Sequence, residues 1–163
     1  MQFVEAQEAD WPIIEKLAQQ SWWHGYANVL SDQQIQFMLQ QLYSEEGIRK
    51  AMQTGQRFYL ATENHNSIGF MALQHKQPDI LRIEKLYLLP QVQGKGYGRA
   101  LLDFAQQRAL ALQIHTIELN VNRKNKAYFF YLKQGFHIVE EIDIPYFNFI
   151  LDDYIMQKTI PTT

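Results

Sequence analysis

The sequence predicts an α/β protein in which one mixed β-sheet has helices on both of its faces. Segments whose apolar residues alternate, as in strands, are interleaved with segments whose apolar residues recur every three or four positions, as in helices. In chain order the expected elements are β-α-α-α-β-β-β-α-β-α-β-β, an order typical of a mixed sheet. Apolar residues make up 47% and charged residues 20% of the chain, a composition that supports a folded core and excludes disorder.

The first third of the chain indicates one short strand followed by three helices. Val4 marks the strand, and Asp10 is the expected N-cap of the first helix, ahead of a tryptophan and a proline in its first turn. Ser31, with a glutamine three residues later, has the pattern of a capping box for a second helix that extends to about Tyr43. Ser44 is expected to cap the third helix.

The rest of the chain alternates between strands and two further helices. The turn-rich residues 63–67 connect two of the strands, and the last two strands are expected to form a hairpin. One helix is expected over residues 98–112, because its leucines and alanines recur along one face as far as Leu112. Another begins after its N-cap Asn125 and stops at Gly135. The expected strands are residues 57–62, 68–75, 80–89, 116–121, 136–144 and 149–155.

Charge and residue usage exclude several function classes. The net charge of -2 lacks the basic excess of nucleic-acid-binding domains, so no nucleic-acid partner is expected. The lack of cysteine excludes disulfides, thiolate metal sites and cysteine nucleophiles, and the five histidines show no ligand spacing, so no metal site is expected. The sequence shows neither a signal peptide nor an apolar stretch of membrane-spanning length, so we expect a cytoplasmic protein without a membrane partner. The length predicts a single domain over residues 1–163.

The segment with the clearest chemistry is a glycine-rich connection between an expected strand and an expected helix. Glycine lets the backbone approach a ligand closely, and successive N–H groups at the start of a helix bind phosphates. The segment therefore predicts a phosphate or pyrophosphate site; the alternative is a strand-to-helix turn without a ligand. The Walker pattern is absent, and the G-x-G-x-G spacing differs from the dinucleotide fingerprint. The candidate residues are Gln93, Gly94, Lys95, Gly96, Tyr97, Gly98 and Arg99.

The sequence resembles the GCN5-related N-acetyltransferases (the GNAT superfamily) in two separate blocks. The first is Gln93-x-x-Gly96-x-Gly98, followed by Ala-Leu-Leu and preceded by the apolar segment 86–90, and it is similar to the acetyl-CoA signature of that family. The second block begins at Asn125 and continues through Tyr131 to a Gly-Phe pair. With both blocks, the resemblance covers roughly residues 57–157.

The resemblance implies a fold and a cosubstrate. The family's central mixed sheet is splayed into a V, and the pantetheine arm of acetyl-CoA pairs with exposed backbone in the opening, like an added strand. For this chain that implies pantetheine binding by the backbone of Leu86, Tyr87 and Leu88, and pyrophosphate binding by the amides of residues 94–99. Asn125 is a plain helix cap, a contact to the cosubstrate, or both. The apolar alternation changes phase near residues 84–85, which is compatible with a β-bulge.

Two residues are candidates for proton transfer. An alkyl ammonium has a pKa of ~10, so its nitrogen must lose a proton before it can attack a thioester. Glu84 on the central strand is the candidate base; the alternative is a solvated carboxylate or a partner of Arg82. The resemblance implies that Tyr131 is the acid that protonates the leaving thiolate; the alternative is core packing within an aromatic helical run.

The acceptor follows from a second, more local resemblance. Segments 22–31, 43–44 and 153–156 look similar to bacterial spermidine/spermine (polyamine) acetyltransferases, so we expect transfer to a primary amine of a small molecule, with a polyamine as the leading candidate. The alternatives are a protein N-terminal, lysine or antibiotic acetyltransferase and a catalytically silent acyl-CoA-binding regulatory module. The resemblance also allows for a homodimer, which is common in the family.

Two groups of side chains are candidates for acceptor contacts. An aromatic group either walls an acceptor pocket or packs at a helix end; its members are Trp22, Trp23, His24 and Tyr26. An acidic group either attracts a polycation or forms solvated faces; its members are Glu45, Glu46, Asp152 and Asp153.

Overall fold

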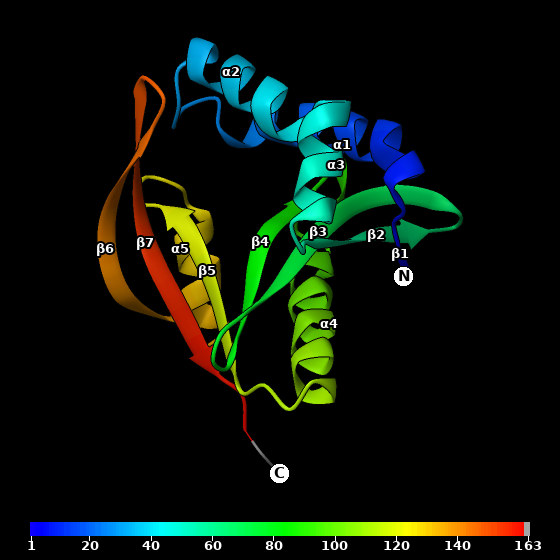
Figure 1. The fold of residues 1–163 in the computed structure, drawn as a ribbon, viewed down its shortest axis with the longest axis vertical. Coiled ribbons are helices and arrows are strands. Elements are labelled where there is room, and N and C mark those ends of the chain that lie inside the picture. The colour runs from blue at the N-terminus through cyan, green and yellow to red at the C-terminus, as the bar shows by residue number, and fades with distance from the viewer. Residues whose placement is uncertain (162–163) are drawn as a thin grey trace. The chain divides into compact units, whose positions relative to one another are not determined.

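The computed structural model describes residues 1–161 and has a mixed sheet of seven strands with five α-helices. The strands are β1 (Gln2–Glu5), β2 (Arg57–Glu63), β3 (Asn66–Lys76), β4 (Ile80–Leu88), β5 (Thr116–Asn122), β6 (His137–Tyr146) and β7 (Phe149–Thr159). The helices are α1 (Trp11–Gly25), α2 (Asp32–Tyr43), α3 (Glu45–Gln53), α4 (Tyr97–Ala111) and α5 (Ala127–Lys133), with two 3-10 helices, η1 (Glu8–Asp10) and η2 (Pro90–Val92). The strand order is β1-β2-β3-β4-β5-β7-β6 (Figure 1), and β4 pairs in parallel with β5. The predicted fold class is confirmed.

The chain divides into two compact units, each built from two separate segments. The first unit comprises residues 1–74 and 84–101, and the second comprises residues 75–83 and the chain from residue 102 onward. Both β4 and α4 contribute residues to each unit. Because neither unit is a continuous stretch, the chain is not two domains in series. A single domain over residues 1–163 stays a prediction, and its last two residues lie outside the described part.

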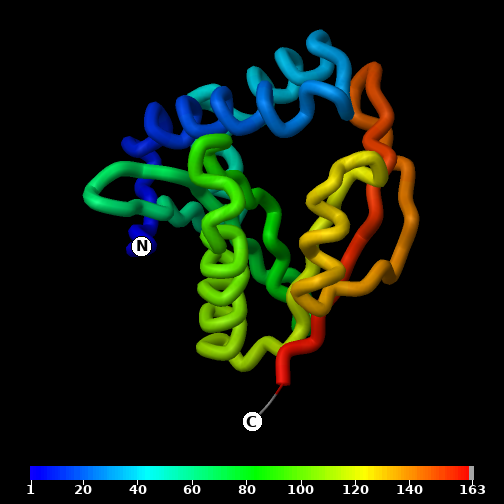
Figure 2. Tube along the Cα trace, turned by 180° about the vertical axis from the view of Figure 1, so that it is seen from behind, coloured from blue at the N-terminus to red at the C-terminus, as the bar shows by residue number. Residues whose placement is uncertain are grey.

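Three helices of the first unit have ends that the sequence largely predicts. α1 and α2 run side by side, and α3 packs against both (Figures 1 and 2). The Ser31 and Ser44 hydroxyls accept hydrogen bonds from the backbone N–H groups of Gln34 (3.1 Å) and Gly47 (3.2 Å), which confirms both serines as N-caps. Of the capping box at Ser31 the structure shows the hydroxyl bond, and the Gln34 side-chain NH₂ group donates to Met38 Sδ (3.7 Å).

Asp10 does not cap α1 with its side chain, contrary to the prediction. Its carboxylate accepts a hydrogen bond from the backbone N–H of Gln7 (2.8 Å) and so closes η1, the turn that precedes α1. The Asp10 backbone (φ −85°, ψ 4°) is also not in the extended conformation typical of an N-cap. The helix still begins at Trp11, with Pro12 in its first turn, where no N–H partner is needed.

The hairpin of β2 and β3 turns through two residues, not five. Glu63 pairs with Asn66, and between them Asn64 and His65 have positive φ angles of 50° and 67°. Two consecutive left-handed residues form a tight turn whose twist suits antiparallel strands. The composition of the segment located the turn correctly but overestimated its length, because the residues after His65 already belong to β3.

The second unit has a hairpin and a helix-covered face. β6 and β7 form the predicted hairpin, and α5 lies on one face of the strands β5, β7 and β6 (Figures 1 and 2). On that face the Tyr128 ring of α5 lies 5.2 Å from the Tyr154 ring of β7, between centroids. β7 extends beyond its predicted end, because it pairs with β5 as far as Thr159 opposite Thr116. The alternation of β5 is confirmed, with buried Ile117, Leu119 and Val121.

The apolar face predicted for α4 is confirmed except at its end. Leu101, Ala105 and Ala109 are fully buried, whereas Leu112 is 51% exposed. The helix ends at Ala111, and the positive φ of Gln113 (59°) turns the chain away from the helical path. Leu112 therefore does not continue the apolar face of α4. The next apolar residue, Ile114, is buried instead.

Candidate functional site

The central strand of the predicted site lies in the first unit as residues 84–88 of β4. The predicted site residues on it, all half-buried, are Glu84, Leu86, Tyr87 and Leu88. The Leu88 carbonyl oxygen accepts hydrogen bonds from the Ser21 hydroxyl of α1 (3.2 Å) and the Gln93 side-chain amide (3.5 Å). Gln93 therefore joins the glycine-rich loop to the end of this strand.

Gly69 on β3 supports the same strand end and was missed at the level of sequence. A Cβ at this position would lie 2.5 Å from the Tyr87 carbonyl oxygen and 3.3 Å from the Leu88 Cα. Glycine therefore lets β3 lie this close to β4, and next to it the Leu89 N–H donates to the Ile68 carbonyl (2.9 Å). The available signal was a lone glycine inside an apolar strand segment, which indicates a close backbone approach.

The glycine-rich loop has the backbone conformations that its composition predicts. The φ angle is 80° at Gly94 and 83° at Gly96, a region that residues with a side chain rarely adopt. A Cβ at either position would meet nothing within 4 Å, so backbone conformation rather than space requires glycine. Gln93, Lys95 and Arg99 are exposed, which leaves the loop open to solvent.

The loop leads directly into the first turn of α4, which suits an anion. The Ala100 N–H donates to the Gly96 carbonyl (3.2 Å), and the N–H groups of Tyr97, Gly98 and Arg99 precede this first helical hydrogen bond. The first turn of α4 carries no carboxylate, whereas the first turns of α2 and α3 do. The dipole of this 15-residue helix adds positive potential at the same place.

The Tyr97 side chain joins the loop to another part of the first unit. Its hydroxyl donates a hydrogen bond to the Glu63 carboxylate at the end of β2, and this bond raises the pKa of Tyr97. Tyr97 therefore offers its backbone N–H at the helix start while its side chain holds the loop to the β2–β3 hairpin.

Asn125 lies in the second unit, in the turn that leads into α5. Its side-chain oxygen accepts a hydrogen bond from the Ala127 N–H (2.9 Å), and its carbonyl oxygen accepts one from the Tyr128 N–H (3.1 Å). The N-cap position of α5 is Lys126, so Asn125 acts one residue earlier than predicted, through the turn that leads into the helix. Besides the oxygen used here, the Asn125 side-chain amide has two N–H donors.

Tyr131 also lies in the second unit, on α5. It is 8% exposed, and its ring centroid lies 5.5 Å from that of Phe130 and 5.8 Å from that of Phe136. The ring therefore packs in the core, which was one of the two interpretations. Core packing also fixes the direction of the hydroxyl, so the catalytic interpretation stays open as a prediction.

Lys85 is a buried charge next to Glu84 that sequence reasoning did not single out. It is 8% exposed, and its ammonium donates a hydrogen bond to the Gln56 side-chain oxygen (2.6 Å). The Nζ atom also lies 5.9 Å and 5.5 Å from the ring centroids of Tyr43 and Phe58. Burial lowers the pKa of Lys85 to about 8, although the neighbouring Glu84 charge opposes this shift. Burial of Lys85 continues the alternation of β4 through residues 84–85, contrary to the expected phase change.

Lys85→Met is expected to raise the free energy of unfolding at neutral pH by about 1–3 kcal/mol, because it removes a desolvated charge from the core. The folded pKa of about 8 lies below the unfolded value of ~10.4, so the unfolded chain binds more protons between these values. Wild-type stability should therefore rise with pH from about 8 to about 10.4. Below about pH 8, the destabilisation by the charged Lys85 should have its full size. Urea unfolding across this range tests both points, and a Met variant that is less stable at every pH would contradict them.

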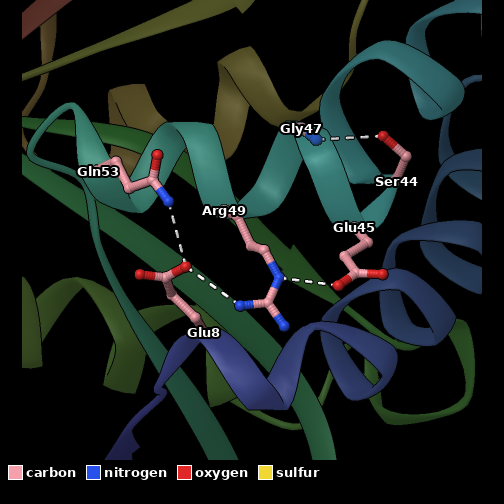
Figure 3. Close-up of polar contacts among 6 residues, drawn as sticks. All are labelled: Glu8, Ser44, Glu45, Gly47, Arg49 and Gln53. Atoms are coloured by element: carbon pink, nitrogen blue, oxygen red, sulfur yellow. Dashed lines mark hydrogen bonds and ion pairs between the residues drawn. The ribbon is translucent and has the colours of Figure 1, made fainter.

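The acidic and aromatic groups proposed for the acceptor have mixed environments. Glu45 is paired with Arg49 (2.9 Å), which also contacts Glu8 (3.2 Å), so one guanidinium is shared between two carboxylates (Figure 3). The Asp153 carboxylate accepts a hydrogen bond from Asn120 (3.2 Å), and burial raises the pKa of Asp153. In the aromatic group, Trp23 and His24 are exposed. Tyr26 is half-buried and Trp22 is buried.

The described part of the chain lacks two other kinds of functional feature. None of the helices in residues 1–161 has both the length and the hydrophobicity needed to cross a bilayer. The same residues contain no group of three or more His, Asp or Glu side chains placed to hold a metal ion.

Comparison with known proteins gives a consistent set of relatives. Residues 26–144 match the family described as the acetyltransferase (GNAT) domain. A curated spermidine N(1)-acetyltransferase from Thermoplasma acidophilum is 30% identical over 157 residues, which cover 91% of each chain. This relative therefore matches nearly the whole length of the protein, including both units.

Solved structures agree with the sequence matches. The PaiA N-acetyltransferase from Thermoplasma acidophilum, solved in complex with coenzyme A, is 27% identical with a TM-score of 0.82, covering 97% of this chain and 98% of that one. The ribosomal-protein-S18-alanine N-acetyltransferase from Escherichia coli is 19% identical with a TM-score of 0.74, covering 99% and 95%. The second likeness concerns the fold alone, and the first extends to a protein that binds coenzyme A.

Proposed function

This chain belongs to the GNAT acetyltransferase family, and we propose that it acetylates a primary amine of a polyamine. The protein is an acetyl-CoA-dependent N-acetyltransferase. The observation that carries the polyamine proposal is the 30% identity with a spermidine N(1)-acetyltransferase over 91% of both chains. The likeness to the S18-alanine enzyme does not favour a protein acceptor, because it reflects the fold alone.

The residues of the first unit fit the cosubstrate. Acetyl-CoA supplies an acetyl thioester at one end and a pyrophosphate toward the other. We propose that the amides of the loop and the α4 start bind the pyrophosphate, supported by the positive φ of Gly94 and Gly96 and by a helix start without carboxylates. The backbone of residues 86–88 would bind the pantetheine arm. We also propose Asn125 as a contact to the cosubstrate, through its side-chain amide.

Two side chains are proposed to move protons. Glu84 would accept a proton from the acceptor ammonium, directly or through a water molecule, so that the nitrogen is neutral when it attacks. Its half-buried position on β4, between the buried Ile83 and Lys85, supports a fixed orientation for the carboxylate. Tyr131 would donate its phenol proton to the departing sulfur, and the packing of its ring against Phe136 supports a fixed position for the hydroxyl.

An amine panel tests the acceptor. The purified chain is mixed with acetyl-CoA and with spermidine, spermine, a lysine peptide, an alanine-terminated peptide or an aminoglycoside, and release of the free thiol is followed. Turnover with spermidine and not with the peptides is the expected result. Turnover with a peptide or the aminoglycoside alone would replace the polyamine proposal. Tight binding of acetyl-CoA without turnover on any amine would indicate a silent acyl-CoA-binding module.

Gly96→Asp is expected to weaken acetyl-CoA binding at least tenfold, or about 1.4 kcal/mol, because it places a negative charge against the pyrophosphate. Its backbone strain must be separated from its charge, since Gly96 has a φ of 83°. Gly96→Asn is the matched control, because asparagine has the same shape, carries no charge and tolerates left-handed backbone better than most residues. Calorimetric titration should show the Asp variant well below the Asn variant. Equal affinities of the two variants would contradict an anion site at this loop.

A further inference from the structure

Five aromatic rings gather in the first unit around the end of β4. The Tyr87 ring lies 5.6–6.4 Å, between centroids, from the rings of Trp22 and Tyr26 on α1, Tyr43 on α2 and Phe70 on β3. Within this cluster the Tyr26 and Tyr87 hydroxyl oxygens lie 3.2 Å apart, and both side chains are half-buried. Two phenol oxygens therefore meet beside the strand end that is proposed to bind the cosubstrate.

The Trp22 indole adds an unpaired polar group to the aromatic cluster. Trp22 is 3% exposed, and its N–H has no hydrogen-bond partner among residues 1–161. A buried donor without a partner costs about 1–3 kcal/mol, so an oxygen acceptor placed at this N–H would be favoured. A water oxygen that accepts from this N–H keeps a lone pair for a second donor, such as an ammonium.

Three features of the cluster select a cation over an anion. Phenol oxygens accept hydrogen bonds from an ammonium, and the faces of tryptophan and tyrosine rings attract a positive charge. Tyr26 is the C-cap residue of the 15-residue helix α1, and the C-terminal end of a helix carries partial negative charge.

We propose that Tyr26 and Tyr87 bind the distal ammonium of a diamine or polyamine acceptor, the amine that is not acetylated. This inference rests on the proposed function, because it specifies how the same enzyme selects its acceptor. The reacting amine must lose its proton, so a site that favours the protonated form suits the distal amine and not the reacting one. A monoamine has no group for this site, so these two tyrosines determine specificity for acceptors with two or more amines.

Single hydroxyl deletions test the proposal. Tyr26→Phe and Tyr87→Phe keep the rings and are each expected to raise KM for spermidine about tenfold, the effect of losing one hydrogen bond to a charged group. For Tyr26→Phe, the kcat, the Kd of acetyl-CoA and the kinetic constants for butylamine, which has one amine, should stay unchanged. Tyr59→Phe on β2 is the matched control. An unchanged KM for spermidine, or an equal rise for butylamine, would overturn the proposal.

A second measurement does not depend on turnover. The Trp22 and Tyr26 ring centroids lie 4.6 Å apart, so Trp22 fluorescence should change when spermidine binds, and Trp22→Phe should remove this change. A fluorescence change that depends on Tyr26, in a protein that does not acetylate spermidine, would support the cation site and refute the polyamine function. Acetylation of spermidine that neither Phe substitution affects would refute the cation site and leave the function intact.

Discussion

Glu84→Gln is expected to lower kcat by about 10²–10⁴-fold while the affinity for acetyl-CoA stays nearly the same. The glutamine amide has the shape of the carboxyl group but cannot accept a proton, so packing on β4 is kept and the base is lost, together with the charge that opposes the lowered pKa of Lys85. Acetyl-CoA affinity should persist, because its proposed contacts are backbone groups of residues 86–88 and 94–99. The rate of the variant should climb with pH, because the neutral fraction of the amine grows toward its pKa of ~10.

Steady-state kinetics at several pH values and calorimetry with acetyl-CoA measure these two effects separately. Glu140→Gln, an exposed carboxylate on β6, is the matched control for the change of charge and should leave kcat unaltered. Glu84→Asp keeps a carboxylate at a shorter reach and should recover part of the rate. A loss of less than about threefold for Glu84→Gln across the pH range would assign proton removal to water or to another residue.

The glycine-rich loop shows why part of this site could be predicted from sequence. Positive φ at Gly94 and Gly96 is a local backbone requirement, and glycine at both positions makes it visible in the sequence. The caps at Ser31 and Ser44 are local in the same sense, since each hydroxyl bonds an N–H three residues away. Asp10 failed as a cap because another N–H, that of Gln7, lies equally close in sequence, and composition does not indicate which of the two is bonded.

Residues whose roles depend on distant partners could not be predicted in this way. Lys85 has the sequence appearance of a surface lysine, and its burial depends on Gln56 and on rings from α2 and β2. Gly69 is required by the backbone of Tyr87, 18 positions along the chain. The pairing of Tyr26 with Tyr87 joins residues 61 positions apart. Hydrophobic periodicity contains no information about such contacts, because it reports only which face of an element is buried.

Tyr131→Phe is expected to lower kcat by about 10²-fold or more, because the thiolate would leave without a proton donor beside it. The substitution keeps the ring that packs 5.5 Å from Phe130 and 5.8 Å from Phe136, so the free energy of unfolding should hardly change. A phenol with a pKa of ~10 holds its proton at neutral pH, and activity should therefore fall as the pH rises through the phenol's ionisation. The Phe variant should lack that limb of the rate profile. Acetyl-CoA affinity should be nearly unchanged, because the proposed pyrophosphate and pantetheine contacts lie in the first unit.

Tyr128→Phe on the same helix is the matched control, because it removes a phenol oxygen from a ring that packs on Tyr154 and has no proposed part in the reaction. Its kcat and pH profile should match those of the wild type. Rate profiles between about pH 7 and 10.5 and thermal unfolding of both variants separate loss of a proton donor from loss of packing. A folded Tyr131→Phe protein with near-normal turnover and an unaltered profile would return Tyr131 to core packing alone, and the proton for the departing sulfur would then come from solvent.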